Sequence, residues 1–306
     1  MIKLVELFGG IGAVRKALER ENIEFESVGY VEIDKNACKS YNALYNENYL
    51  PMSVCDYHLP EEQIDLLVHG SSCISFSTVG KRDGGVEGSG TESSLMWETV
   101  RIIREAAHKP KIVIWENVAN ILNYPEFQKY IDALDEFGYT STYKVLNSLD
   151  FGIPQTRNRV FTVSILNGSK FNFDNLQTTP MENIDKFVDR TFYSDKYRVA
   201  DRTMAIQFGK LPKNPFNGRN MLVGDYARTI VSNYAKVPTS NIVAVGDKYR
   251  HITEKESWLL MGFDESDFER HRLYILNDIS MEKNVCVAFY IDKQEIVLLF
   301  KYFKQF

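Results

Sequence analysis

The first twelve residues place a glycine-rich turn directly after an apolar run. The run is Ile2–Phe8, the turn is Gly9-Gly-Ile-Gly12, and Val14, Ala17 and Leu18 then recur at helical spacing. Glycine accepts the backbone angles of a tight turn and lets a ligand approach the main chain, while the N-terminus of the next helix offers free N–H groups. A strand, a glycine turn and a helix in this order open a βαβ unit, so we expect a parallel sheet.

Strand-like and helix-like segments continue to alternate as far as about residue 165. The expected strands are 25–33, 66–68, 112–115, 143–145 and 160–165, and the expected helices are 35–45, 94–107 and 126–137. This alternation predicts an α/β fold with a doubly wound, mostly parallel, Rossmann-like sheet. Ligands of such a sheet bind outside the carboxyl ends of its strands.

The composition changes after about residue 167. Residues 168–250 are rich in Asn, Pro, Gly, Lys and Tyr and have little periodicity, whereas 253–261 again has a helical pattern. We therefore expect a main domain at 1–167 and a small loop-rich domain at 168–250 that holds specificity contacts. A return segment and C-terminal tail at 251–306 are expected to pack on the main domain.

Charge is distributed unevenly along the chain. The whole sequence has a net charge of −5, yet eight Lys or Arg face three Asp between residues 190 and 228. The eight are Arg190, Lys196, Arg198, Arg202, Lys210, Lys213, Arg219 and Arg228. This local excess favours an anionic partner such as nucleic acid, although a solvated loop region would have the same composition.

The sequence gives no indication of a membrane span, a metal site or a disulfide framework. It has no 18-residue apolar run, and it begins with a core-like segment rather than a signal peptide. The four cysteines, at positions 38, 55, 73 and 286, form no CxxC pair and no Cys–His group of the kind that binds zinc. We therefore expect a cytoplasmic protein that uses no metal.

Acidic residues follow two of the early extended segments. Glu32 ends the second expected strand, before Ile33, about 20 residues after the glycine turn, where a carboxylate can hold ribose hydroxyls. Asp56 follows a third short extended segment and is placed to meet an adenine edge. An ordinary βαβ turn with exposed acids would have the same pattern.

A single cysteine ends the next apolar strand. The sequence from Leu66 to Thr78 runs from that strand into a loop of small residues that presents Cys73. An exposed thiol with a lowered pKa is a nucleophile, whereas most free cysteines are inert core residues. The glycine-rich loop that follows, at 80–98, is of the kind that closes over a substrate.

Two further polar segments come after buried strands. Glu116-Asn117-Val118 follows an apolar strand, and a carboxylate there needs a partner or a purpose. Gln155-Thr-Arg157-Asn-Arg159 alternates, so both guanidiniums are expected on one face of an extended strand, where they suit phosphate or carboxylate. The alternatives are a satisfied carboxylate with Asn117 as a helix cap, and a surface stripe of salt bridges.

These segments, in this order, resemble the DNA cytosine-5 methyltransferase family of bacterial and phage type. The resemblance covers about residues 1–166 and resumes at Arg228-Thr229-Ile230 and at 250–263. It implies S-adenosylmethionine as methyl donor, S-adenosylhomocysteine as product and double-stranded DNA as partner. The residues that it assigns to the donor are Phe8, Gly10, Gly12, Glu32, Ile33, Asp56 and Leu95. Those that it assigns to DNA are Ser77, Asn117, Val118, Gln155, Arg228 and Thr229.

The resemblance also implies covalent catalysis by Cys73, Glu116, Arg157 and Arg159. The Cys73 thiolate adds to C6 of cytosine, so that C5 attacks the sulfonium methyl group; loss of the C5 proton and of Cys73 completes the cycle. Glu116 binds N3 and the exocyclic amine, Arg159 contacts the base, and Arg157 organises the pocket. We expect the base to be flipped, the 80–98 loop to close over it, and residues of about 170–228 to read the major groove.

Two segments depart from the family pattern. The family usually has Pro-Cys-Gln at the nucleophile, where this chain has Ser72-Cys73-Ile74, and proline would stiffen that turn. The usual Gly-Asn-Ser segment and apolar helix near the C-terminus are replaced by the sequence that follows Tyr290. These departures leave open a weakened or inactive DNA-binding homologue.

Other expectations concern partners and alternatives. Within the same fold, the alternative is a tRNA cytosine-5 methyltransferase, although the polar insertion with its Lys and Arg favours duplex DNA. The chain is expected to act as a monomer in a bacterial or phage-infected cell, with a cognate restriction endonuclease as a candidate partner.

Overall fold

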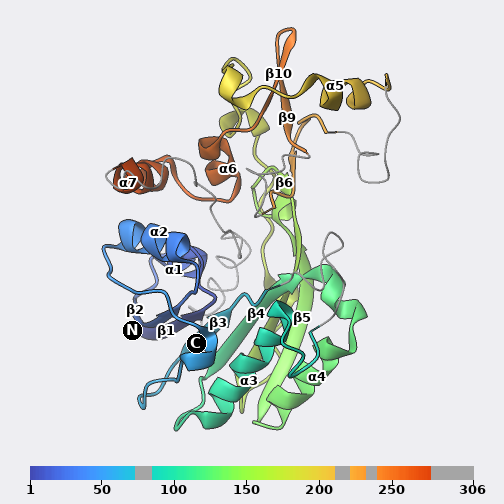
Figure 1. The fold of residues 1–306 in the computed structure, drawn as a ribbon. Coiled ribbons are helices and arrows are strands. Elements are labelled where there is room, and N and C mark those ends of the chain that lie inside the picture. Colours follow the sequence, from blue (N-terminus) through green and yellow to red (C-terminus); the bar gives the residue numbers. More distant parts are fainter. Residues whose placement is uncertain (73–84, 211–220, 232–239, 277–306) are drawn as a thin grey trace. The chain divides into compact units, whose positions relative to one another are not determined.

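The computed structural model describes residues 1–72, 85–210, 221–231 and 240–276, which form two compact units (Figure 1). The first unit contains Met1–Asn147 and Asn158–Thr178, and the second contains Ser148–Arg157 together with the described residues beyond 178. Within these ranges, no helix is long and apolar enough to cross a membrane.

A six-stranded sheet forms the centre of the first unit. In sheet order its strands are β2 (Phe25–Val31), β1 (Ile2–Leu7), β3 (Leu66–His69), β4 (Ile112–Val118), β7 (Asn158–Leu166) and β5 (Tyr139–Asn147). Strands β1 to β4 are parallel to one another, and β7 runs antiparallel to both of its neighbours. The predicted mostly parallel, doubly wound sheet is therefore confirmed.

The first unit has four described α-helices, and two of them begin at clear signals in the sequence. They are α1 (Ala13–Arg20), α2 (Lys35–Tyr45), α3 (Met96–Glu105) and α4 (Pro125–Asp135), with short 3-10 helices η1 (Val54–Asp56), η2 (Glu92–Leu95), η3 (Ala119–Asn123) and η5 (Phe173–Asn175). Before α2, the Asp34 carboxylate accepts from the N–H groups of Asn36 and Ala37 at 2.7 and 2.9 Å. Helix α4 begins at Pro125, where the missing N–H costs nothing.

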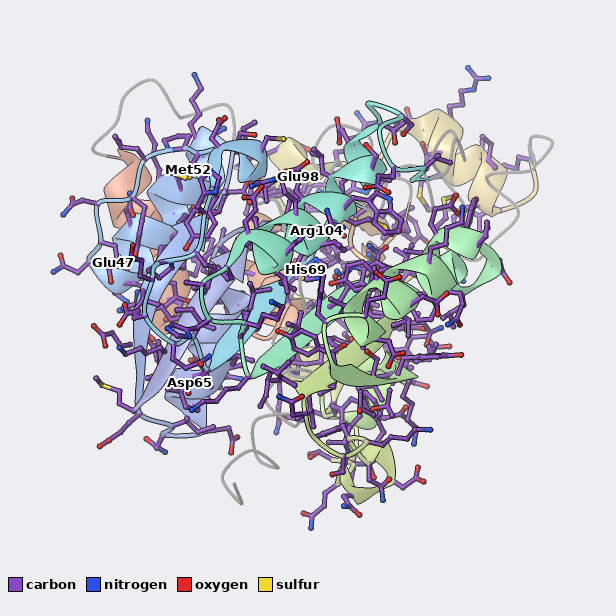
Figure 2. The ribbon with its side chains drawn as sticks, turned by 90° about the horizontal axis from the view of Figure 1, so that it is seen from below. Glu47, Met52, Asp65, His69, Glu98 and Arg104 are labelled. Atoms are coloured by element: carbon purple, nitrogen blue, oxygen red, sulfur yellow. The ribbon has the colours of Figure 1, made fainter. Side chains whose placement is uncertain are left out.

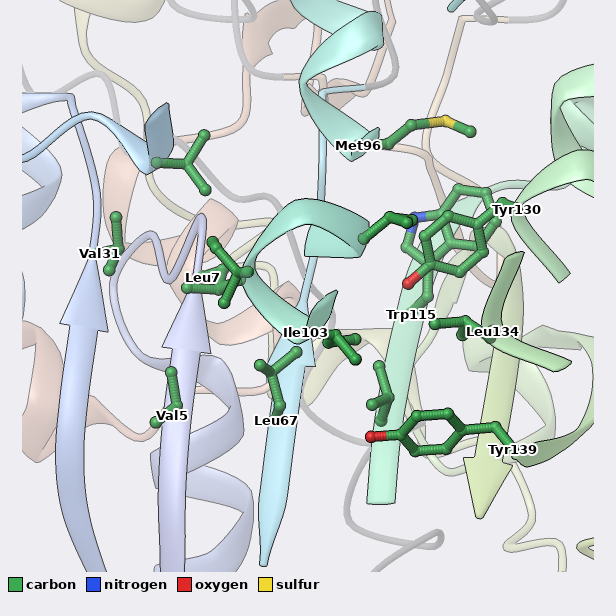
Figure 3. Close-up of a cluster of buried hydrophobic side chains, with 14 of the residues drawn as sticks. Val5, Leu7, Val31, Leu67, Met96, Ile103, Trp115, Tyr130, Leu134 and Tyr139 are labelled. Carbon is green, nitrogen blue, oxygen red and sulfur yellow. The ribbon is translucent and has the colours of Figure 1, made fainter. Parts of the chain in front are cut away.

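Side chains alternate between the two faces of β1, and each face is covered by its own helices. Val5 and Leu7 belong to a large apolar cluster with residues of α3 and α4, as Figure 3 shows. Glu6, which lies between them, faces the other side and accepts a hydrogen bond from Tyr41 of α2. The sheet therefore has helices on both faces.

The second unit is built from short elements. They are η4 (Ser148–Asp150), β6 (Gln155–Thr156), η6 (Ile184–Lys186), η7 (Asp195–Tyr197), α5 (Asp201–Gln207), β8 (Ala227–Arg228), β9 (Ile242–Val245), β10 (Lys248–His251), α6 (Glu254–Leu260) and α7 (Glu265–Leu276). Strand β6 pairs with β8, and β9 pairs with β10.

A buried ion pair lies at the start of α6 in this unit. Both terminal nitrogens of Arg250 donate to Glu256 at 2.7 Å, and the guanidinium is fully buried. Glu256 also completes a capping box with Thr253, which fixes the first turn of the helix expected at 253–261.

Candidate active site

The turn after β1 has an unusual backbone. Phe8, Gly10 and Gly12 all have positive φ angles, of 55°, 54° and 79°. This left-handed region costs glycine little, whereas Phe8 adopts it only because its surroundings hold it there. The Gly9 N–H donates to Val31 of β2 at 3.1 Å, and the Gly12 N–H donates to Gly9 at 2.9 Å. The turn is therefore well defined and tied to the neighbouring strand.

Glu32 connects the end of β2 to the same turn. Its Oε2 accepts from the Gly10 N–H at 3.0 Å, and its Oε1 accepts from the Asp34 N–H at 2.8 Å. Burial raises the pKa of this carboxyl, and the backbone N–H bonds act against that rise. Each oxygen keeps a second lone pair, so the carboxylate can still accept a hydrogen bond from a hydroxyl group of a ligand. Next to it, the Ile33 side chain is 71% exposed and offers an apolar surface.

Asp56 and Leu95 lie on two short 3-10 helices. Asp56 ends η1, and Leu95 ends η2, directly before α3. Asp56 is exposed and belongs to the 3-10 turn η1, where the sequence had indicated an extended segment. Ser53 caps the turn, and Arg101 of α3 donates to two of its backbone carbonyls and to that of Tyr57, the next residue. Leu95 is half-buried and packs against the core beside α3.

Ser71 is held from strand β4. The Trp115 indole N–H donates to Ser71 Oγ at 3.0 Å, and the Asn117 amide donates to the Ser71 carbonyl at 3.2 Å. These bonds follow from the register, because His69 pairs with Trp115 and two residues further on Ser71 faces Asn117. The backbone two residues before Cys73 is therefore anchored. Cys73, Ile74, Ser77 and residues 80–84 lie outside the described residues.

His69 supports this arrangement from within the sheet. Its Nε2 lies 2.7 Å from the Tyr130 hydroxyl, and its ring stacks on Trp115 at 5.7 Å between centroids. Complete burial lowers the pKa of His69 to about 3, so the ring is neutral at pH 7. Figure 2 shows the side chain in the interior of this unit, whereas Glu47 and Asp65 lie toward its periphery.

Glu116 and Arg159 form a buried ion pair between β4 and β7. Arg159 Nε lies 2.9 Å from Glu116 Oε1, and the two side chains are only 13% and 4% exposed. Glu116 pairs with Phe161 and Val118 with Arg159, so the two charged residues are diagonal neighbours on one face. The sequence had ended this strand at Trp115; β4 continues to Val118 because β7 pairs with it along its whole length.

Gln155 has a structural position in the second unit. Its amide nitrogen donates to the Leu260 carbonyl at 2.8 Å, and its amide oxygen accepts from the Ile230 N–H at 2.9 Å. Thr229 donates to the Thr156 carbonyl at 2.7 Å, and Arg228 lies on β8. The segment around Gln155 is therefore joined to the segment that contains the assigned residues Arg228 and Thr229.

Arg157 differs from the expectation of one extended strand. Strand β6 ends at Thr156 and β7 begins at Asn158, because the chain changes pairing partner at Arg157. The buried Arg157 guanidinium donates to the Ile230 carbonyl at 3.4 Å, whereas Arg159 contacts Glu116. The two arginines therefore have different partners and do not form one stripe.

Several basic residues of the second unit are already paired. Arg190 lies 2.7 Å from Asp185, Arg198 lies 2.8 Å from Asp201, and Lys196 lies 2.9 Å from Glu254. Lys213 and Arg219 lie outside the described residues. The local basic excess seen in the sequence is thus partly neutralised by acids, including one from beyond residue 228.

Sequence reasoning did not select Ser71 or Trp115. Each lies two positions from a residue of interest, Cys73 in one case and Asn117 in the other, on neighbouring parallel strands. The period-two alternation was visible in the sequence, but the strand register that brings them together was not.

The fold of the chain is also found among solved structures. Its structure matches that of the Dnmt2 methyltransferase from S. pombe with a TM-score of 0.74, covering 100% of this chain and 99% of the other at 16% identity. The sequence matches the model of the C-5 cytosine-specific DNA methylase family over residues 2–276, and the chain belongs to that family.

Relatives in bacteria agree with this assignment. The Type II methyltransferase M2.ScrFI of Lactococcus lactis subsp. cremoris is 27% identical over 90% of this chain and 92% of its own length. The Type II methyltransferase M.BanI of Aneurinibacillus aneurinilyticus is 36% identical over 91% of this chain and 63% of its own length. The chain is thus a cytosine-5 methyltransferase by family, and the family's methyl donor is S-adenosylmethionine.

Proposed function

We propose that the chain methylates C5 of a flipped cytosine in a short double-stranded DNA site, through a covalent bond between Cys73 and C6. The arrangement on β4 carries this proposal. Glu116, paired with Arg159, and Asn117, bonded to Ser71, are consecutive residues of one strand. Strand β4 thus carries the Glu116 carboxylate, which is suited to bind the base, and holds Ser71, whose backbone leads to Cys73.

The glycine turn fits S-adenosylmethionine. The turn and the N-terminus of α1 offer backbone N–H groups, and the Glu32 carboxylate is fixed beside them to accept ribose hydroxyls. Exposed Ile33, with Asp56 and Leu95, would contact the adenine. When bound, the donor supplies an electrophilic methyl group on a sulfonium.

Each side chain of the target half has a distinct task. The Cys73 sulfur bonds to C6, which raises electron density at C5, and it leaves after the C5 proton is lost. Glu116 accepts from the exocyclic amine and, carrying a proton, donates to N3, so that this proton neutralises the negative charge that thiolate addition places on the ring. Arg159 balances the buried carboxylate and contacts the base, while Arg157 and Gln155 order the strand that precedes it.

DNA recognition is assigned to the polar part of the chain. Residues of about 170–228 would read the major groove, with Arg228 and Thr229 near the target. The 80–98 loop would close on the flipped base, with Ser77 near a phosphate. Within the described part of that segment, the Trp97 indole N–H donates to the Gly85 carbonyl at 2.8 Å. The enzyme would act as a monomer on cytoplasmic DNA, with a cognate endonuclease as candidate partner.

Trapping on 5-fluorocytosine tests this function. Fluorine at C5 cannot leave as the proton does, so the enzyme should remain bound to duplex DNA through Cys73 when S-adenosylmethionine is present. A denaturing gel should show the complex with the wild type and with Cys55→Ser, an exposed cysteine that serves as control, but not with Cys73→Ser.

Methyl transfer from labelled donor to duplex DNA and to tRNA completes the test. We expect transfer to DNA only. Transfer to tRNA alone would replace the proposed substrate, and absence of both the complex and the transfer would leave a DNA-binding homologue without activity.

A further inference from the structure

A group of tyrosines packs behind the glycine turn, on the α2 face of the sheet. Tyr30 comes from β2, and Tyr41 and Tyr45 come from successive turns of α2. Tyr30 and Tyr41 stack at 3.8 Å between ring centroids, and Tyr41 and Tyr45 lie 4.7 Å apart. Tyr30 and Tyr41 are buried and Tyr45 is half-buried, so the three rings form one wall.

Two of these tyrosines donate hydrogen bonds to the turn. The Tyr30 hydroxyl donates to the Gly10 carbonyl and the Tyr45 hydroxyl donates to the Gly12 carbonyl, both at 2.6 Å. The Tyr41 hydroxyl is directed elsewhere, to Glu6 at 3.0 Å. Because Glu32 accepts from the Gly10 N–H, both the N–H and the carbonyl of Gly10 are hydrogen-bonded to side chains.

The tyrosine rings pack directly against two glycines of the turn. A Cβ at Gly9 would lie 2.7 Å from the Tyr30 ring, and one at Gly12 would lie 2.5 Å from Tyr45 and 2.8 Å from Tyr41. The sequence had suggested that these glycines leave room for a ligand. At Gly9 and Gly12 the space that a side chain would fill is occupied by tyrosine, so the turn fits closely on the side of the wall.

We propose that Tyr30 and Tyr45 are positioning residues of the donor-binding turn, and that their hydroxyl groups set its affinity for S-adenosylmethionine. A turn with three positive φ angles in five residues would have other conformations available without these bonds. Holding it in one conformation before the donor arrives reduces the entropy lost on binding. This inference rests on the proposed function, since it concerns the donor of that reaction.

The test uses Tyr30→Phe, Tyr45→Phe and the double variant, which keep the rings and remove the hydroxyls. Tyr139→Phe is the matched control, because its buried hydroxyl also donates to a backbone carbonyl, that of Pro110 at 2.6 Å, from the strand at the opposite edge of the sheet. We expect the Kd for S-adenosylmethionine by calorimetry to rise about fivefold in each single variant and about twentyfold in the double.

Three further readouts separate positioning from general loss of stability. The KM for DNA and the kcat at saturating donor should stay within about twofold of wild type, and the melting temperature should fall no more than in Tyr139→Phe. Amide hydrogen exchange of residues 9–12 in the free enzyme should quicken in the Tyr30 and Tyr45 variants alone. Unchanged donor affinity in the double variant, or equal weakening in Tyr139→Phe, would overturn this inference. As long as the wild type binds the donor, neither result would contradict the proposed function. A wild-type chain that binds no donor would overturn both.

Discussion

The proposed donor side of the sheet, at β1 and β2, and the proposed target side, at β4 and β7, each bury a glutamate, and they stabilise it differently. On β1, Glu6 is surrounded by the tyrosine wall and accepts from the Tyr41 hydroxyl at 3.0 Å. On β4, Glu116 lies 2.9 Å from the Arg159 guanidinium. Both side chains are nearly inaccessible to solvent, so the difference lies in the partner rather than in burial.

The partner decides what each carboxyl can do. Burial raises the pKa of Glu6 to about 7, and the hydrogen bond from Tyr41 and the nearby Arg15 charge only partly oppose that rise. Glu6 is thus a carboxyl that takes up a proton near neutral pH. Glu116 has a cation in direct contact, and in the proposed mechanism that cation offsets the negative charge of the carboxyl and of the substituted base.

Removing the cation on the target side should have the largest effect. Arg159→Met keeps an unbranched stem of similar length but leaves Glu116 buried without its cation. We expect kcat to fall at least about 100-fold and the free energy of unfolding to fall by about 3 kcal/mol. Labelled methyl transfer and urea unfolding measure the two quantities.

Two variants give this experiment its controls. Glu116→Gln combined with Arg159→Met removes both charges, so it should recover most of the stability and none of the activity. Arg190→Met breaks the more exposed pair with Asp185 and should cost less than about 1 kcal/mol. Equal stability of Arg159→Met and wild type would show that the two buried carboxyls do not differ as described.

The elements around both sites could be predicted from local sequence. The apolar run, the glycine turn and the helical spacing of Val14, Ala17 and Leu18 all lie within one stretch, and all three side chains are buried on α1. The helix expected at 35–45 is α2, because Asp34 supplies its cap next to its first residue. Family resemblance then supplied the proposed roles of Glu32, Glu116 and Arg159.

The contacts between elements could not be predicted in the same way. Glu116 meets Arg159 only because β7 runs antiparallel beside β4 in one register, and Ser71 meets Trp115 only through the register of β3 and β4. A slip of one residue would reverse every side chain. Tyr30 and Tyr45 were likewise missed, although Tyr30 shares a strand face with Glu32 and Tyr41 and Tyr45 share a helix face.

Glu6, on the proposed donor side, should make the free energy of unfolding depend on pH. The pKa of Glu6 is about 7 in the folded chain and 4.5 as the ordinary value, so the folded state holds this proton more tightly. Unfolding then releases the proton between about pH 4.5 and 7, and the contribution of Glu6 to stability falls across that window by about 3 kcal/mol. Below the window the penalty is absent, and above it the penalty is complete.

Glu6→Gln cannot titrate, so its unfolding free energy minus that of wild type should rise by this amount from pH 4.5 to 7.5. His69 contributes with the opposite sign, because its folded pKa is lowered to about 3, but it is present in both proteins and cancels. Urea unfolding at several pH values gives the difference, and Glu61→Gln repeats the same substitution at an exposed position. A flat difference for Glu6→Gln would mean that Glu6 is ionised throughout, as a glutamate with a cationic partner would be.

The smallest effect is expected where the target side depends on a neutral hydrogen bond. Trp115→Phe keeps an aromatic ring against His69 but removes the N–H that donates to Ser71 at 3.0 Å. The Asn117 amide still holds the Ser71 carbonyl, so the anchor is weakened rather than lost. We expect about 1 kcal/mol less stability and a kcat about tenfold lower, since small displacements near a reacting group are costly. The KM for S-adenosylmethionine should not change, because the donor turn does not depend on this bond.

Two companion variants determine whether the bond itself is responsible. Ser71→Ala removes the acceptor, so the double variant with Trp115→Phe should be no slower than the slower single one. Ser72→Pro, which restores the proline usual in the family, stiffens the backbone directly and should recover part of the kcat lost in Trp115→Phe. Additive losses in the double variant would show that Trp115 acts through its ring alone. In that case the hydrogen bond from Trp115 to Ser71 would contribute nothing to kcat, and the contrast with the donor turn would reduce to the charge pair of Glu116 and Arg159.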